Sequence, residues 1–132
     1  MSAGNFKPQS HWPALAFALI ALVLGSNAAM AEEPVSEITQ LLDALSLSQC
    51  EFFRNGSWYG AERARAHLER KLAYVRRSQP DISAEQFIAV AASESSRSGE
   101  PYRVRCGATE QQSAQWFLER LEKIRATASI EE

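Results

Sequence analysis

This sequence has no surplus of positive charge and lacks the short motifs that mark common cofactor and nucleotide sites. Its 132 residues include 14 Lys and Arg against 16 Asp and Glu, a formal net charge of −2. A protein whose main partner is nucleic acid needs a clear cationic excess to neutralise phosphates, so we expect no nucleic-acid partner. The sequence contains no phosphate-binding loop, dinucleotide-binding motif or calcium loop, and no cofactor is predicted.

Cysteine and histidine are scarce, with two of each in the whole chain. Two cysteines without a pair of histidines make a poor zinc site, and their spacing is not that of a C-x-x-C redox motif, so no metal site is predicted. An even number of cysteines in a small exported domain favours a structural disulfide. We therefore expect a disulfide between Cys50 and Cys106, with two free thiols as the alternative.

Only one long apolar run occurs, close to the amino terminus. Residues 1–13 contain one lysine and no acid, residues 14–24 are all apolar, and alanines at 29 and 31 flank Met30. This is the order of regions in a secretory signal peptide, and a membrane span would need about 20 apolar residues. We predict cleavage after Ala31, with an uncleaved anchor as the alternative. Residues 32–132 would then form one periplasmic or secreted domain without a transmembrane span.

Hydrophobic periodicity predicts four helices in that domain. Apolar residues recur at helical spacing over residues 36–47 and 61–77. A capping box at Ser83 opens a third helix, and its almost continuous apolar surface favours a central helix packed on two sides. The fourth helix is capped by Thr109 or Ser113 and runs to about residue 128.

Two segments have the pattern of β-strands. Residues 51–59 read as a hairpin, because Asn55-Gly56 is a strong signal for a type I′ turn. Residues 101–106 alternate Tyr102 and Val104 with arginines, as expected for a half-buried strand. We therefore expect an α+β fold with about four helices, a small two- or three-stranded antiparallel sheet and one disulfide.

Several short motifs are similar to those of a known family. They are Phe53-Arg54-Asn55-Gly56, His67 to Lys71 (HLERK), Phe87-Ile88 and residues 95–102 (SSRSGEPY). In order and approximate spacing they resemble the YfeK-like family of small exported bacterial proteins, classed as a domain of unknown function. The resemblance extends over residues 37–121 and implies export and a compact mixed fold. It implies no activity.

Seven residues with nitrogen or oxygen hydrogen-bonding groups form a candidate binding cluster. They are Arg54, Asn55, His67, Lys71, Ser96, Ser98 and Tyr102. His67 and Lys71 lie four residues apart on one helix, in line with Tyr74. If the sheet packs on this helix, the seven residues converge into a small polar pocket for a carboxylate, phosphate or sugar hydroxyl. The alternative is an internal hydrogen-bond network that binds nothing.

Two further features suggest other functions. A serine hydrolase would use His67 as its base with a serine near Ser96, but the sequence has no G-x-S-x-G elbow. Residues 61–77 contain six basic and two acidic residues, which suits anionic lipid or an acidic partner, or simply a solvated face. We expect a non-enzymatic binding or accessory module of the cell envelope that takes an anionic ligand or envelope component, with the hydrolase as the alternative.

Overall fold

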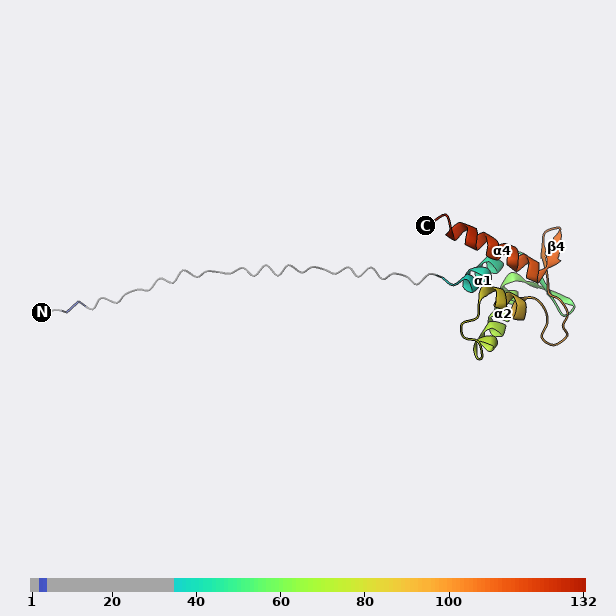
Figure 1. Cartoon of the computed structure of the whole chain (residues 1–132), viewed down its shortest axis with the longest axis horizontal. Helices are drawn as coiled ribbons and strands as arrows, with labels where there is room; N and C mark the ends of the chain where they lie inside the picture. Colours follow the sequence, from blue (N-terminus) through green and yellow to red (C-terminus); the bar gives the residue numbers. More distant parts are fainter. Residues whose placement is uncertain (1–2, 5–34) are drawn as a thin grey trace. The chain divides into compact units, whose positions relative to one another are not determined.

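In the computed structural model (Figure 1), residues 3–4 and 35–132 are described, so nearly all of the predicted signal peptide lies outside them. The helices of the folded unit are α1 (Glu37–Leu47), α2 (Ala61–Arg76), α3 (Ala84–Phe87), the π-helix η1 (Ile88–Ala92) and α4 (Ser113–Ala128). The strands are β1 (Glu51–Arg54), β2 (Ser57–Gly60), β3 (Arg103–Cys106) and β4 (Thr109–Gln112). The predicted α+β fold class is confirmed. In the described part of the chain, no helix is long and apolar enough to cross a membrane.

The four strands form one antiparallel sheet in the order β2-β1-β3-β4. The predicted hairpin is present, and Asn55 and Gly56 have φ angles of 47° and 84°, the two positive values that a type I′ turn needs. The sheet has one strand more than predicted, because residues 109–112 pair with β3. The last helix begins at Ser113 with Gln112 at its N-cap position, so the predicted capping by Thr109 or Ser113 is wrong. Strand β4 carries the polar sequence TEQQ at an exposed sheet edge. It therefore lacks the alternation that identifies a half-buried strand.

Two copies of a ββα unit make up most of the fold. Adding 52 to the bounds of β1, β2 and α2 gives the bounds of β3, β4 and α4. The strand register repeats in the same way, since Glu51 pairs with Gly60 and Arg103 pairs with Gln112. In each unit the helix starts at the residue after the second strand, so the hairpin fixes the direction in which the helix leaves the sheet.

An approximate two-fold axis relates the two units and passes through the centre of the sheet. Phe52 and Val104 are equivalent residues in the two units, and they also pair with each other where β1 meets β3. The symmetry is not visible in the sequence. Of the 26 positions in each unit, only Lys71 and Lys123 carry the same residue.

The two ends of the β1–β3 ladder are closed differently. Continuing its register by one residue places Cys50 opposite Cys106 at one end and Arg54 opposite Tyr102 at the other. Cys50 and Cys106 form the predicted disulfide, with their Cα atoms 4.5 Å apart. The two-fold axis relates this covalent closure to the Arg54–Tyr102 end of the ladder, which is held without a covalent bond.

The helices cover one face of the sheet, and the core lies between the two layers (Figure 1). Phe52 of β1 and Val104 of β3 face the helices and are buried, whereas Phe53 and Arg103 on the other face are partly exposed. The largest fully buried side chains of the unit are Trp116, Tyr102, Phe52, Phe87 and Phe117. Tyr102 packs its ring on Phe52 at a centroid distance of 5.0 Å, so the core fixes the position of its hydroxyl group.

The helical segment over residues 84–92 agrees with the prediction except in its second half. The capping box at Ser83 is present and the segment packs against both α2 and α4, as predicted, but its second half is a π-helix. Ile88 is buried, whereas Val90 remains 46% exposed. The buried residues of the segment recur at i, i+3, i+4, i+7 and i+8 from Ala84, and this spacing places Val90 on the outward side of the helix. The Ser93 hydroxyl donates a 2.6 Å hydrogen bond to the Ile88 carbonyl at the π-helical turn.

We expect removal of the disulfide to destabilise the fold strongly. The bond joins residues 56 positions apart, and closing such a loop contributes about 2–4 kcal/mol to the free energy of unfolding. The double variant Cys50→Ala with Cys106→Ala should lose a value in this range in urea denaturation. A reducing agent should shift the midpoint of the native protein toward that of the variant and leave the variant unchanged. Equal midpoints for the oxidised protein and the variant would contradict the prediction.

Candidate functional site

The seven candidate residues come together from the β1–β2 hairpin, α2 and the loop that precedes β3. Six of them line one cavity of about 340 Å³, and these are Arg54, Asn55, His67, Lys71, Ser96 and Tyr102. The seventh, Ser98, donates its hydroxyl to Asn55 Oδ1 at 3.0 Å and so joins the loop to the hairpin turn. Ser95 and Arg97 also line the cavity and were not among the predicted residues.

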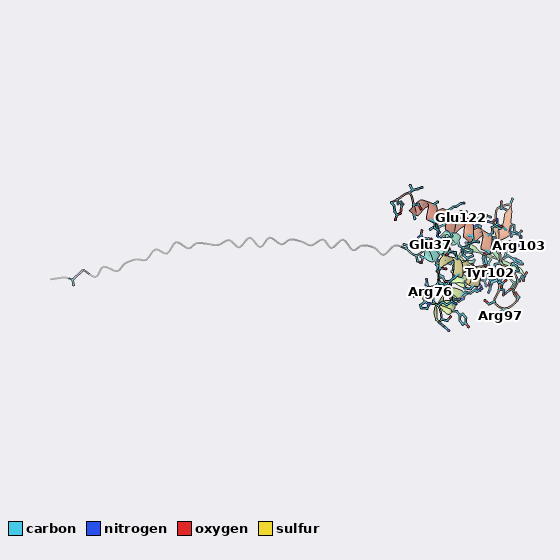
Figure 2. All side chains as sticks on the ribbon, in the orientation of Figure 1. Glu37, Arg76, Arg97, Tyr102, Arg103 and Glu122 are labelled. Carbon is cyan, nitrogen blue, oxygen red and sulfur yellow. A yellow bond between two sulfur atoms is a disulfide. The ribbon has the colours of Figure 1, made fainter. Side chains whose placement is uncertain are left out.

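The loop over residues 93–102 is held by its own hydrogen bonds. Its two ends are joined because the Tyr102 backbone N–H donates to the Ser93 carbonyl at 2.9 Å. The buried Ser95 hydroxyl accepts from the backbone N–H groups of Arg97 and Ser98, each at 3.3 Å. Serines here satisfy backbone groups in a tight turn. Figure 2 shows Tyr102 within the folded unit and Arg97 at its outer edge.

A chain of side-chain hydrogen bonds crosses the site. Arg54 Nη1 lies 3.2 Å from His67 Nδ1, and His67 Nε2 lies 3.0 Å from the Tyr102 hydroxyl oxygen. Lys71 Nζ donates to the same hydroxyl oxygen at 3.3 Å and to the Glu94 carbonyl at 2.9 Å. His67 and Lys71 of α2 therefore meet at the hydroxyl oxygen of Tyr102, and Arg54 of β1 joins the chain through His67.

The direction of these hydrogen bonds follows from their chemistry. A guanidinium group can only donate, so His67 Nδ1 accepts from Arg54 and the imidazole proton resides on Nε2. That proton is donated to Tyr102, whose oxygen also accepts from Lys71. Both acceptor positions of the hydroxyl are then occupied. The O–H proton of Tyr102 is left to donate to a group outside this chain of residues.

Burial and neighbouring positive charges set the protonation states. Burial, followed by the charges of Arg54, Lys71 and Arg70, lowers the pKa of His67 to about 4. Burial also lowers the pKa of Lys71 and raises the pKa of Tyr102. At neutral pH the imidazole and the phenol are therefore uncharged, and the positive charge of the site belongs to the lysine and the arginines.

Among the residues that the structure describes, the cations at the cavity have no carboxylate partners. Four arginines, namely Arg65, Arg103, Arg105 and Arg125, form ion pairs with acidic residues. Over residues 35–132, no such pair involves Arg54, Lys71 or Arg97, and no carboxylate residue lines the cavity. The site thus combines unpaired positive charge with free hydrogen-bond donors.

A second hollow of about 550 Å³ adjoins the first. Only part of its lining could be predicted from the sequence. The two share His67, Lys71 and Ser96 as lining residues, and the second also includes Tyr74 and Val90. The helical spacing of His67, Lys71 and Tyr74 pointed to this side of α2. Val90 was not predicted to contribute, because its segment is apolar almost all round and was expected to be packed on two sides.

The hydrolase hypothesis gains no support from this geometry. Ser96 lines the same cavity as His67, but both ring nitrogens of His67 already contact Arg54 and Tyr102. A group with a pKa of about 4 is also a weak base at neutral pH. A serine–histidine pair of the kind that activates a nucleophile requires a free imidazole nitrogen facing the hydroxyl.

Residues 32–125 match the Family of unknown function (DUF5329). This match covers most of the sequence, so the chain belongs to that family. Neither the curated proteins nor the solved structures contain a match to it. The family description assigns no activity, and the resemblance to the YfeK-like family stays a prediction that the match does not test.

We expect His67 to titrate near pH 4 in the folded protein and near pH 6.5 in the unfolded chain. Between these values the unfolded chain binds a proton that the folded protein does not bind, so the free energy of unfolding decreases as the pH falls. NMR of the imidazole measures the pKa directly. In Arg54→Gln the pKa should rise but stay below 6.5, because burial is its largest cause. A native value near 6.5 would contradict the prediction.

Proposed function

We propose that this protein is an exported, non-enzymatic module of the bacterial cell envelope that binds an anionic group in the cavity between β1, α2 and the 93–102 loop. The observation that carries the proposal is the direction of the hydrogen bonds at Tyr102 Oη. This oxygen accepts from His67 and Lys71, so its own proton needs an acceptor. A carboxylate or phosphate oxygen supplies one.

Several other groups at the cavity suit the same kind of ligand. The Lys71 ammonium makes two hydrogen bonds and has a third N–H to donate. The guanidinium groups of Arg54 and Arg97 line the same cavity, and charge-assisted hydrogen bonds to an anion are the strong ones. Neutral His67 adds no charge of its own, but it orients the hydroxyl group of Tyr102.

An internal network that binds nothing is the competing explanation for these contacts. Such a network would satisfy its own donors, whereas here the tyrosine proton and the unpaired cations border open space of about 340 Å³. Buried polar groups are normally satisfied by partners. Donors that face an open cavity favour a binding site over a purely structural network.

Export is the second part of the proposal. It is supported by the signal-like amino-terminal sequence, by the Cys50–Cys106 disulfide, which is typical of oxidising compartments, and by a family match that begins at residue 32. Processing after Ala31 would leave 101 residues with a net charge of −3, since Lys7 is the only charged residue removed.

We expect inorganic phosphate and acetate to bind at this site. In an NMR titration, backbone signals of His67, Lys71 and Tyr102 should shift together. Lys71→Met should weaken binding by roughly tenfold or more, because one charge-assisted hydrogen bond is lost. Lys123→Met is the matched control: it removes the same charge at the equivalent position of α4 and should change the affinity by less than about twofold. Equal losses in the two variants, or no binding at all, would overturn the anion site.

Processing can be tested separately in a bacterial host. We expect the mature protein in the periplasmic fraction, with Glu32 as its first residue and without free thiols. Intact-mass measurement with and without alkylation gives both results. An intact amino terminus on a cytoplasmic protein would refute export and would leave the anion site to be judged by its own titration.

A further inference from the structure

We infer that the ligand of this site is an anionic amphiphile whose charged end lies at Tyr102 and Lys71 and whose apolar part lies in the hollow along Tyr74, Val75 and Val90. This inference rests on the proposed anion site and specifies the class of ligand. The occupant is a small molecule with one acidic group and an attached apolar chain.

The two hollows form one amphipathic groove. They share His67, Lys71 and Ser96 as lining residues, so the polar and apolar parts meet at these side chains. Their volumes, about 340 and 550 Å³, fall within the range of small-molecule pockets. A ligand that follows the groove therefore passes directly from cationic to apolar surroundings.

Lys71 marks the boundary between the two parts. Its ammonium group donates to the Tyr102 hydroxyl and the Glu94 carbonyl and lies 4.9 Å from the centre of the Tyr102 ring. A lysine commonly packs its methylene stem on apolar surface while its charged end contacts polar groups. This arrangement matches the junction between the acidic end and the apolar chain of an amphiphile.

The apolar part of the groove is exposed in the free protein. Tyr74 is 71% and Val90 is 46% exposed, and Val90 lies within the π-helix η1. Local departures of this kind from regular helix geometry are frequent at functional sites. The apolar chain of a ligand would remove this surface from water, which is favourable in proportion to the area covered.

Charge decides which amphiphile fits. Arg54, Arg70, Lys71 and Arg97 line the combined groove, and no acidic side chain does. A cationic amphiphile is repelled there, and a neutral one offers no charged acceptor to the lysine and arginines. An acidic head group satisfies both the unpaired charges and the free proton of Tyr102.

A chain-length series tests the inference with defined probes. The affinity of the purified protein for acetate, butanoate, hexanoate and octanoate is measured by calorimetry below micelle formation. We expect the affinity to rise by roughly threefold for each methylene group added. Octylamine and octyl glucoside, which have the same chain without the negative charge, should bind at least tenfold more weakly than octanoate.

Two matched variants locate the apolar chain. Val90 and Leu118 are 46% and 45% exposed, so replacing either with serine leaves the core intact. Val90→Ser should reduce the gain between acetate and octanoate and leave the affinity for acetate unchanged, whereas Leu118→Ser should change neither. Thermal melting verifies that both variants are folded.

The possible outcomes separate this inference from the proposed function. If acetate binds and octanoate binds no more tightly, the anion site stands and the amphiphile is excluded. If no carboxylate or phosphate binds, the proposed function itself fails. A chain-length gain that Val90→Ser does not reduce, or one that accompanies dimer formation in sedimentation, overturns the assignment of the chain to this hollow.

Discussion

Antiparallel pairing of β1 with β3 is the constraint on which the rest of the molecule depends. It joins two ββα units across the Phe52–Val104 pair, and because each helix begins directly after its hairpin, it also fixes where the helices lie. The same pairing brings Arg54 beside Tyr102, so that α2 can complete the site with His67 and Lys71. The fold and the cavity are consequences of a single strand register.

The positive charges at the cavity have no acidic side chain beside them in the part of its lining that the structure describes. Arg65, Arg103, Arg105 and Arg125 form ion pairs with nearby carboxylates, and exposed pairs of this kind contribute little to stability. At the cavity the cations face other donors instead, and the imidazole is kept neutral by burial and by their charge. Like charges in such a cluster repel one another, and a bound anion would offset that repulsion. The arrangement is therefore better explained by recognition of an anion than by stability.

Much of the fold could be predicted because the signals are local. Asn55-Gly56 specified a turn, the helical stripes specified α1, α2 and α4, and two cysteines left one pairing. β4 was not predicted, because an exposed edge strand needs no apolar residues. The π-helix η1 was not predicted, because a 3.6-residue apolar period does not reveal a π-helical turn. The seven candidate residues were chosen for their chemistry and spacing, and the structure brings them together; their role in binding stays a prediction. The adjoining apolar hollow depends on the outward position of Val90, which only the three-dimensional structure shows.

The two ends of the β1–β3 ladder are equivalent in the repeated ββα units but carry different residues. A two-fold scaffold would ordinarily present two equivalent binding positions, one in each half. At the second position, cysteines replace Arg54 and Tyr102, and Glu119 replaces His67. The sulfur–sulfur bond occupies the place that the hydroxyl and the guanidinium occupy at the first. If the proposed anion site is correct, the disulfide at the second position leaves room for one ligand per chain.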